Sequence, residues 1–447
     1  MKNNFTLFFL LFAVNFFSCQ TWEIQNQVFP GNYDDVADLS IVSDNNVWIY
    51  TNNNPGKFAK TINGNASWVH GQFSDITSYY TNYASNNFYT IIHLSGIDAL
   101  NASVMVYYSL PVNNYAYADV WKTNDGGTTW QKKLTIDGNL GGKMVHFFNA
   151  NTGFAISTNA TGWQPERRYK LYRTNDGGQN WTLATDVPNT PGALVINKYT
   201  QGDAAYIWES TVSGYRILKT TDQGLTWSYI PHYFGGSQWN LTAWSDINKG
   251  IVVEQNPSTG VAKKFLRTTD GGLNWTEITS TGIPLSWIGD IAYVPGTNVL
   301  LATGQGGSIT STHGSWISTD NGNTFTTLDS NIYHKNVRCS NGGICYSGGI
   351  NMTTTKSIMY KLDLSNFLKT QESKTENEGV YPNPTKGEIY IKSKKEIITA
   401  SIYDLTGRLL IQSKEKNIDT SPLASGIYFL KIKFQDGTYS SEKIIRD

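Results

Sequence analysis

Charge is scarce in this sequence. Charged residues make up 16% of the 447 positions, and Lys plus Arg equal Asp plus Glu at 35 each. Because neither sign is in excess, the composition does not favour binding to nucleic acid or to an anionic membrane. Cysteine is limited to three residues, and the six histidines are scattered without the spacing of metal ligands. We expect no metal and no cofactor.

Several short motifs that carry chemistry are also missing. The chain has no Gly-x-Ser-x-Gly turn for a nucleophilic serine, no P-loop, no His-Glu-x-x-His zinc motif and no Asp-x-Asp-x-Asp-Gly calcium loop. No stretch after the N-terminal segment approaches the length of a transmembrane helix. These absences argue against nucleotide-dependent enzymes, zinc proteases and integral membrane proteins.

The N-terminus has the pattern of a secretory signal peptide. Lys2 precedes an apolar run over residues 5–17, and Ser18-Cys19-Gln20 follows. The run is too short to cross a bilayer comfortably, so we assign residues 1–19 to a cleaved signal peptide. Lipidation of Cys19 remains an alternative, although the residues before it are a poor lipoprotein signal. The mature chain is therefore expected to reach the periplasm and then the outside of the cell.

Only two cysteines follow the signal peptide. Cys339 and Cys345 flank residues 340–344 (SNGGI), which read as a β-hairpin turn. The two side chains would face each other across the hairpin, so an extracellular disulfide is expected, with two unpaired buried thiols as the alternative. Its role would be structural.

What the sequence has in abundance is aromatic residues, at 13%, and glycine, with 41 copies. Few charges with many aromatics and glycines are typical of an extracellular β-protein. The most informative feature is an eight-residue block, Thr/Ser-x-Asp-x-Gly-x-(Thr/Asn)-(Trp/Phe). It occurs at residues 123–130, 174–181, 220–227, 268–275 and 318–325. A weaker copy at 61–68 has Asn63 in place of the aspartate.

Each fixed position of the block has a physical role. The aspartate can accept backbone N–H groups and close a tight turn, and the glycine allows positive φ. The terminal aromatic residue begins the next strand and buries a large apolar surface. We therefore predict structural roles for Asp125, Gly127, Trp130, Asp176, Gly178, Trp181, Asp222, Gly224, Trp227, Asp270, Gly272, Trp275, Asp320, Gly322 and Phe325.

The block resembles the Asp-box, also called the bacterial neuraminidase (BNR) repeat. Sialidases, sortilin-type receptors, xyloglucanases and photosystem II assembly factors carry this repeat in β-propellers. The resemblance implies an all-β propeller with each block on the outer rim, between the third and fourth strands of a blade. It also implies that the repeated aspartates are structural and do not form a catalytic cluster.

The repeat also predicts the number of blades. Successive block aspartates are 46 to 51 residues apart, which fits four-stranded blades. Seven hairpin segments and seven outer strands give seven blades over residues 21–365. Residues 21–27 would supply the fourth strand of the last blade and so close the ring. The longer interval before Asp125 indicates an insertion, with the Tyr-rich residues 77–90 as the candidate.

The C-terminal part differs from the propeller. Residues 366–379 read as a polar linker, and residues 380–387 (VYPNPTKG) introduce short alternating strands. Residues 380–447 resemble the type A sorting domain of the type IX secretion system of Bacteroidetes. This resemblance implies a small Ig-like β-sandwich that the outer-membrane translocon recognises, on a secreted or surface-attached protein. An ordinary adhesion sandwich is the alternative.

Arginine usage argues against sialidase activity. Sialidases require three arginines that converge on a carboxylate, and the propeller has only six in total. Arg173 and Arg267 directly precede blocks, where Lys122 and Lys219 also stand, so they occupy a repeated position on the rim. The N-terminal Arg-Ile-Pro motif is absent.

Candidate ligand-binding residues lie in the segments that enter the innermost strands. They are Tyr33, Asp34, Asp35, Trp239, Trp287, Asp290, Tyr333 and His334. Aromatic faces next to amide and carboxylate groups suit sugar rings or extended peptides. We therefore expect non-catalytic binding of a glycan or an extracellular protein, with packing of Trp239 and Trp287 between blades as the alternative.

An extracellular glycoside hydrolase is the second hypothesis. It requires two carboxylates at a suitable separation. The candidates lie on or near loops before innermost strands, and they are Asp34, Asp35, Asp246 and Asp290. Loop aspartates more often cap turns, so we favour binding over catalysis. The sequence does not identify the ligand or the oligomeric state.

Overall fold

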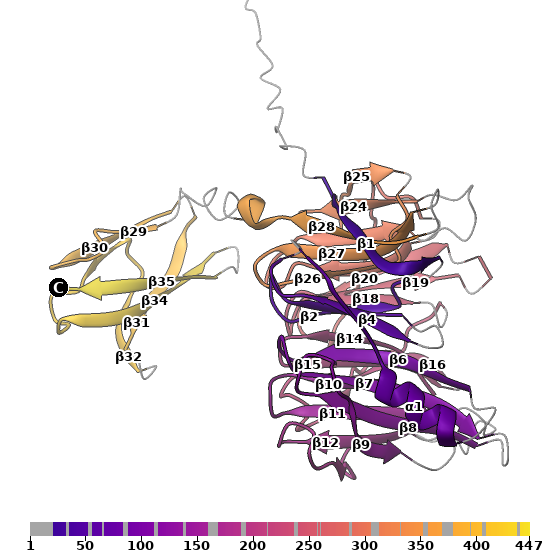
Figure 1. Ribbon diagram of the computed structural model, residues 1–447. Coiled ribbons are helices and arrows are strands. Elements are labelled where there is room, and N and C mark those ends of the chain that lie inside the picture. Colours follow the sequence, from indigo (N-terminus) through magenta and orange to yellow (C-terminus); the bar gives the residue numbers. More distant parts are fainter. Residues whose placement is uncertain are drawn as a thin grey trace, which may run out of the picture. The chain divides into compact units, whose positions relative to one another are not determined.

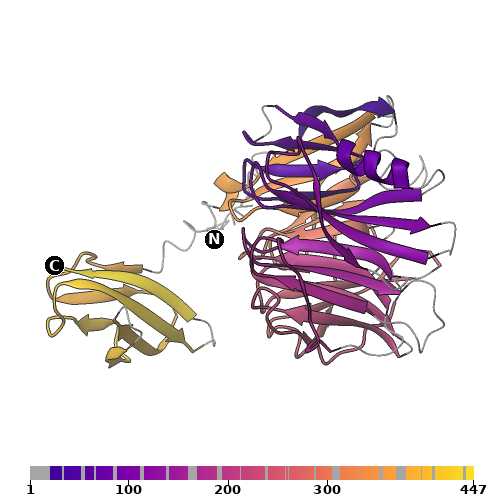
Figure 2. The same ribbon diagram turned by 60° about the horizontal axis from the view of Figure 1, so that its bottom comes forward.

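The computed structural model describes residues 21–32, 35–51, 56–64, 67–83, 88–110, 115–136, 140–159, 169–188, 194–211, 213–236, 240–256, 258–259, 261–285, 288–304, 313–330, 332–351, 356–368, 379–393, 395–404, 408–435 and 439–447. The chain forms two compact units, residues 1–364 and 365–447. Nearly all the regular structure is β-strand (Figures 1 and 2).

Four-stranded antiparallel sheets repeat along the first unit. The first sheet contains β2 (Asp38–Ile41), β3 (Val47–Tyr50), β4 (Lys57–Thr61) and β5 (Val69–Gln72). The second contains β6 (Phe88–Gly96), β7 (Ala102–Leu110), β8 (Tyr115–Thr123) and β9 (Gln131–Ile136). The third contains β10 (Leu140–Phe147), β11 (Gly153–Asn159), β12 (Tyr169–Thr174) and β13 (Thr182–Leu183).

The later sheets repeat this order. The fourth contains β14 (Leu194–Gln201), β15 (Ala204–Thr211), β16 (Gly214–Thr220) and β17 (Ser228–Tyr229). The fifth contains β18 (Leu241–Trp244), β19 (Gly250–Gln255), β20 (Ala262–Thr268) and β21 (Thr276–Ile278). The sixth contains β22 (Ile288–Tyr293), β23 (Leu300–Gly304), β24 (Gly314–Ser318) and β25 (Thr326–Ser330). The seventh contains β26 (Asn336–Cys339), β27 (Ile344–Asn351), β28 (Lys356–Asp363) and β1 (Glu23–Asn32).

The seven sheets close into a ring. The first strand of each sheet contacts the first strand of the next, and β26 contacts β2. The last sheet takes its outer strand from the N-terminus, since β1 pairs with β28 through Glu23–Lys361 and Ile24–Tyr360. Figure 1 shows β1 (indigo) beside the orange strands β27 and β28. The predicted seven-bladed propeller with terminal strand closure is confirmed.

Buried side chains hold the closing strand in place. Phe29 is only 1% exposed and packs in a cluster with Val36 and Met359. Just before β1, the Trp22 indole N–H donates to Ser315 Oγ of the sixth sheet at 2.7 Å. The N-terminal segment therefore joins two neighbouring blades and completes the seventh sheet.

The repeated blocks lie between the third and fourth strands of their blades, and we call them clasps. In the clasp of residues 123–130, Thr123 Oγ1 donates to Asp125 Oδ1 and accepts from Gly127 N, both at 2.8 Å. Asp125 Oδ1 also accepts from Thr129 N at 2.9 Å. The other four strong copies repeat this geometry, at Asp176, Asp222, Asp270 and Asp320.

Both residues after the aspartate adopt positive φ. In the first strong clasp these are Gly126 at 77° and Gly127 at 92°. Gln223 and Asn321 occupy the first of these positions in two other clasps, with φ of 58° and 62°. The turn therefore tolerates a side chain at the first position, whereas glycine stands at the second in all five strong copies.

A basic residue before the clasp bridges to the next blade. Lys219 Nζ donates to Gly271 O in the following clasp at 2.8 Å, and Lys122 Nζ donates likewise to Gly177 O. At the seam, Lys361 Nζ donates to Gly64 O at 3.1 Å, from the last blade to the first. The rim thus repeats one inter-blade contact, because an otherwise buried carbonyl needs a donor.

The Tyr-rich insertion forms a helix. α1 (Ser74–Tyr83) falls within the interval where extra length was expected, and Ile76 and Tyr80 lie on its buried face. Tyr80 Oη donates to the buried Asp119 Oδ2 of β8 at 2.5 Å. The spacing of four residues between Ile76 and Tyr80 puts both on one helical face, which packs against the second blade.

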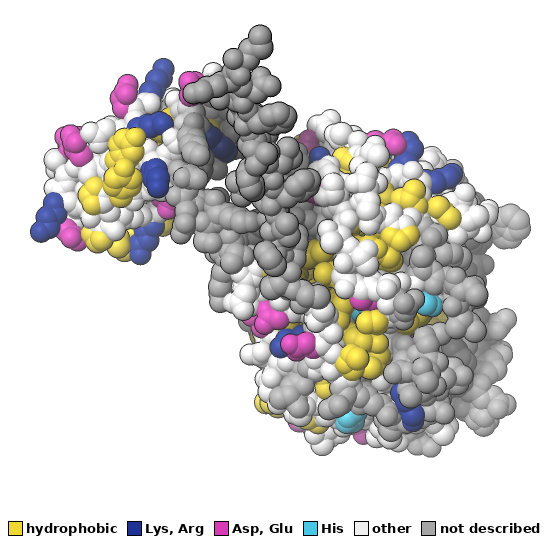
Figure 3. All heavy atoms as spheres, turned by 90° about the horizontal axis from the view of Figure 1, so that it is seen from above, with side chains coloured by type: hydrophobic (Ala, Val, Ile, Leu, Met, Phe, Trp, Pro, Cys, Tyr) yellow, Lys and Arg dark blue, Asp and Glu magenta, His cyan; other side chains and the backbone are white. Residues whose placement is uncertain are grey.

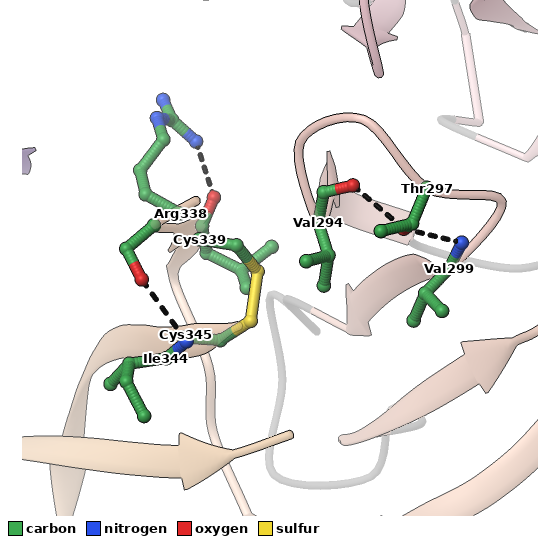
Figure 4. The surroundings of a disulfide bond; sticks show 9 residues. Val294, Thr297, Val299, Arg338, Cys339, Ile344 and Cys345 are labelled. Atoms are coloured by element: carbon green, nitrogen blue, oxygen red, sulfur yellow. Dashed lines mark hydrogen bonds between the residues drawn. A yellow bond between two sulfur atoms is a disulfide. The ribbon is translucent and has the colours of Figure 1, made fainter. Parts of the chain in front are cut away.

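Cys339 and Cys345 form a disulfide bond (Figure 4). They are directly opposite each other in the β26–β27 ladder, with Cα atoms 4.0 Å apart. The bond joins the innermost and second strands of the seventh blade.

The C-terminal unit contains two sheets. One comprises β29 (Gly379–Tyr381), β30 (Glu388–Lys392) and β33 (Asn417–Asp419). The other comprises β31 (Ile397–Tyr403), β32 (Leu409–Ser413), β34 (Gly426–Phe434) and β35 (Tyr439–Arg446). Alternate residues of β30 and β34 are buried, and one apolar cluster joins the two sheets. This arrangement is a small β-sandwich.

Within the part of the chain that the structure describes, no helix is long and apolar enough to span a membrane. The predicted signal peptide and most of the predicted linker lie outside the described residues, so both stay predictions.

Candidate functional site in the central channel

A cavity of about 740 Å³ lies among the innermost strands of the propeller. Residues of β2, β6, β10, β14, β22 and β26 line it, together with the turns that follow these strands. Hydroxyl and amide side chains are frequent in the wall, among them Ser40, Asn45, Asn149, Thr200 and Gln201. The cavity is therefore a polar channel at the ring's centre, which is where propellers commonly bind ligands.

Irregular pairing marks the strands around the channel. β6, β10, β14 and β22 each have a register shift against their second strand. Such bulges change the direction of the side chains on either side of them. In β10 the shifted position is Lys143, between Gly142 and Met144. Four of the inner strands thus depart from simple alternation, in β10 at the charged Lys143 itself.

Arg338 binds two carboxylates at the channel. Its Nη1 lies 2.5 Å from Asp290 Oδ2, and its Nη2 lies 3.4 Å from Asp38 Oδ1. Both carboxylates also accept backbone N–H groups: Ile291 N and Val337 N donate to Asp290, and Leu39 N donates to Asp38. One guanidinium therefore links three blades, since these residues belong to β26, β22 and β2.

Burial and charge act against each other in this cluster. Burial raises the pKa of Asp290, although Arg338 favours the ionised carboxylate. For Arg338, burial acts to lower the pKa, but the facing carboxylates of Asp290 and Asp38 outweigh it and raise the pKa. Arg338 thus stays charged at any physiological pH, whereas Asp290 is easier to protonate than an ordinary aspartate.

Two lysines lie across the channel from this ion pair. Lys198 lines the cavity, and burial lowers its pKa to about 8 against the opposing attraction of Asp38. Lys143, on the adjacent blade, has a pKa lowered by burial and repels Lys198. Among the residues described, no carboxylate forms an ion pair with either ammonium group.

Neutral polar groups complete this layer. Burial lowers the pKa of His146 to about 4 and that of His93 well below its usual value, so both rings are uncharged at neutral pH. His93 Nδ1 lies 2.7 Å from Val145 O, which fixes this ring. Tyr199 Oη donates to Trp244 O at 3.2 Å. These groups can bond a ligand without adding charge.

The charges on the face that Figure 3 shows are arranged differently. In the view of Figure 3, Lys and Arg side chains (dark blue) are interspersed with Asp and Glu (magenta), without an extended area of one sign.

Half of the candidate ligand residues from the sequence lie outside the described residues. These are Tyr33, Asp34, Trp239 and Trp287. Asp35 is described and forms an ion pair with Lys335 Nζ at 2.6 Å. Asp290 lies within β22 and not in the loop before it, and it belongs to the channel cluster.

His334 and Tyr333 lie at the seam between the sixth and seventh blades. The His334 ring is fully buried beneath Trp22 and Tyr360. Its Nδ1 lies 2.8 Å from Ser347 Oγ, and its Nε2 lies 3.2 Å from Asp329 Oδ2. These are the residue types of a serine hydrolase triad, but the serine and the aspartate lie on the opposite ring nitrogens, and both His334 and Ser347 are buried.

Tyr333 is half-buried, with its ring centroid 5.7 Å from that of His313. We leave His334 and Tyr333 out of the proposed site, because neither lines the cavity.

The prediction for Asp246 was wrong. This residue follows the innermost strand β18 and does not precede it. Its Oδ1 accepts from Asn248 N and Lys249 N at 2.8 and 2.9 Å, so it caps the β18–β19 turn. Asp246 therefore has the structural, turn-capping role that is common for aspartates in loops.

Sequence reasoning missed Arg338, Asp38 and Lys198 as site residues. A usable signal was present, since most innermost strands carry one charged residue in an otherwise apolar or small segment. The examples are Asp38, Lys143, Lys198, Asp290 and Arg338. A buried strand rarely keeps such a charge unless it is paired or serves binding.

Comparison with known proteins identifies the C-terminal unit. Residues 379–446 match the family described as "Secretion system C-terminal sorting domain". The match indicates that the chain is handled by the type IX secretion system and delivered to the cell surface or beyond it.

The propeller has more distant relatives. A xyloglucanase of Paenibacillus sp. is 25% identical over 160 residues, which are 35% of this chain and 14% of that enzyme. The chain thus covers only a small part of that relative's length. The structure of "YCF48 bound to D1 peptide" has a TM-score of 0.51 at 14% identity, covering 77% of this chain and 95% of that one. The GH74 enzyme of Niastella koreensis has a TM-score of 0.49 at 14% identity, covering 94% and 67%. The likeness to the YCF48 structure supports the propeller fold.

Proposed function

We propose that this protein is a secreted propeller that binds an extracellular glycan in its central channel without catalysing its cleavage. Binding of an extended peptide is the alternative within the same class. The proposal places the ligand among the polar residues that line the 740 Å³ cavity. Similarity to a xyloglucanase supports a glycan as the ligand, and the sorting domain at the C-terminus supports an extracellular location.

One observation above all supports binding without catalysis: a single guanidinium binds both carboxylates at the channel. Asp290 and Asp38 each contact Arg338 and each accept backbone N–H groups. A glycosidase needs one carboxyl group as acid and another free to act as nucleophile or base. Here Arg338 contacts both carboxylates, so neither is free for that role.

One observation favours the enzymatic alternative. Burial raises the pKa of Asp290, which is the direction required of a general acid, and Asp38 lies nearby as a second carboxylate. The two functions differ in whether the glycan is cut.

The test uses the secreted full chain on an array of plant and bacterial polysaccharides, followed by an assay for new reducing ends on each bound glycan. We expect binding without reducing ends. Turnover that Asp290→Asn abolishes would show that the protein is a glycosidase. Binding to peptides and to no glycan would replace the glycan by a polypeptide ligand.

A further inference from the structure

Lys198 and Lys143 differ from the other described interior cations in having no anionic or carbonyl partner, and of these two lysines only Lys198 lines the cavity. Arg338 pairs with Asp290, and the buried Arg216 pairs with Glu209 at 3.0 Å. The rim lysine Lys219 donates to a backbone carbonyl. Among the described residues, no acceptor lies within bonding distance of Lys198 Nζ. An ammonium group that is desolvated but unpaired destabilises a fold, so its retention points to a ligand.

The charges around Lys198 leave room for an anion. Asp38 attracts it, while Arg338 and Lys143 repel it. Asp38 and Asp290 are both bonded to Arg338, so neither is free to approach the lysine. With three cations and two carboxylates, the layer has an excess of one positive charge. A carboxylate or sulfate on a ligand would neutralise it.

The surroundings of Lys198 suit a polyhydroxylated ligand. Thr200 and Gln201 follow it on the same strand, and His93 and Ser40 line the cavity on other blades. These are neutral donors and acceptors that match sugar hydroxyls. His93 is uncharged at neutral pH because burial lowers its pKa. The positive charge is thus local, next to neutral hydrogen-bonding groups.

We propose that the channel selects an acidic glycan, one that carries uronic acid residues, with a ligand carboxylate bound at Lys198. This inference rests on the proposed function and makes it more specific: it names the chemical class of the glycan and the residue that recognises it. The interaction is a charge-assisted hydrogen bond in a partly desolvated site, where it is stronger than on the surface.

The test compares acids with their own neutral esters. Oligosaccharides of galacturonate, glucuronate and mannuronate, and the methyl ester of each, are titrated into the secreted full chain by calorimetry. At least one acid should bind at least tenfold more tightly than its ester. Lys198→Met should remove that preference, and Lys198→Arg should keep most of it. Lys249→Met, at an exposed turn, is the matched control and should change nothing.

The pH dependence gives a second readout. The pKa of Lys198 in the free protein is about 8, so affinity for the acid should fall as pH rises from 7 to 9.5. Lys143 and Arg338 also face this site; Arg338 does not titrate in that range, and Lys143 would add to the fall. In Lys198→Arg the fall should be smaller, because arginine stays protonated.

Each outcome is decisive. If esters and acids bind equally, or if Lys198→Met binds acids normally, the acidic-glycan inference is wrong while glycan binding stands. If the array detects no glycan at all, the proposed function itself fails. Tighter binding of a tetraglutamate peptide than of any uronate would assign the lysine to an acidic polypeptide.

Discussion

On the rim of the propeller and in its channel, aspartates are held in opposite ways. The rim aspartates accept hydrogen bonds from neighbours in their own turn, and the Thr129 bonds hold the pKa of Asp125 at about 2. In the channel, burial raises the pKa of Asp290 although an arginine faces it. Local hydrogen bonds stabilise the charged form on the rim, whereas desolvation disfavours it in the channel.

The rim and the channel also differ in whether their contacts repeat from blade to blade. Rim contacts recur from blade to blade, as in Lys219 to Gly271 and Lys361 to Gly64. The channel residues do not repeat from blade to blade, since the inner strands contribute aspartate, lysine, arginine or no such charge. A repeated contact serves the fold equally in every blade, while a set of unlike residues can recognise an asymmetric ligand.

The largest effect should come from opening the ring that both regions depend on. Phe29→Ala removes a buried ring at the closing strand and should lower the free energy of unfolding by about 3–5 kcal/mol. Ile24→Ala on the same strand is the control, because Ile24 is 68% exposed and should change stability little. Urea unfolding measures the free energy of unfolding of both variants. Equal losses of stability would contradict the conclusion that this strand closes the ring.

A smaller effect is expected from the channel ion pair. Arg338→Met leaves Asp290 and Asp38 without their cation and should cost about 3 kcal/mol near neutral pH. The cost should shrink on acidification, because protonation of the aspartates removes the unpaired charge. A stability loss that is the same at pH 4 and pH 7 would mean that packing, and not charge, is what Arg338 provides.

A single clasp should contribute less. Asp222→Ala removes the acceptor of Thr226 N and should cost about 1 kcal/mol, as for a helix N-cap aspartate. Asp222→Asn should cost less, because the chain's own weak clasp works with Asn63, whose Oδ1 accepts from Ser67 N at 3.1 Å. Thermal unfolding of the two variants tests this order, and the reverse order would contradict the hydrogen-bond account.

The smallest effects should be those of pH on individual aspartates, with opposite signs in the two regions. Asp125 has a lowered pKa, so the stability it contributes is present above its usual pKa and is lost as pH falls towards 2. Asp290 has a raised pKa, so its ionisation destabilises the fold as pH rises above about 4.

Unfolding titrations of Asp125→Asn and Asp290→Asn test the two signs. Relative to the parent protein, Asp125→Asn should lose stability as pH rises from 2 to 5, while Asp290→Asn should gain it from 4 to 7. If the stability of both variants changed with pH in the same direction, the proposed difference between rim and channel aspartates would be wrong.

Much of the fold could be predicted because its signals are local. The clasp needs only residues within eight positions of one another, such as Thr123, Asp125 and Gly127, so its turn is visible in the sequence. The interval between clasps then gives the blade, and the count of blades gives the ring. The helix α1 was missed as a helix because its residues, rich in Tyr, Thr and Ser, have no strong helical propensity. The helix is stabilised instead by the burial of Ile76 and Tyr80.

The channel could not be predicted in the same way. Lys198, Arg338 and Asp38 are separated by at least 140 positions in the sequence, and each looks like an isolated charge in a short strand. The loop residues chosen from the sequence fit the expectation that sites lie in loops. Asp35 and His334 are instead bonded to Lys335 and to Ser347 and Asp329.

The sequence alone determined the repeat, the seven blades, the closing strand and the sorting domain, because each depends on neighbouring residues or on a regular period. Only the tertiary structure decided which charges meet at the centre. Closing a ring brings the middle of each inner strand to a common axis, and bulges in β6, β10, β14 and β22 alter the side-chain alternation there. Which cations are then paired and which remain free, as Lys198 does among the described residues, follows from that three-dimensional geometry.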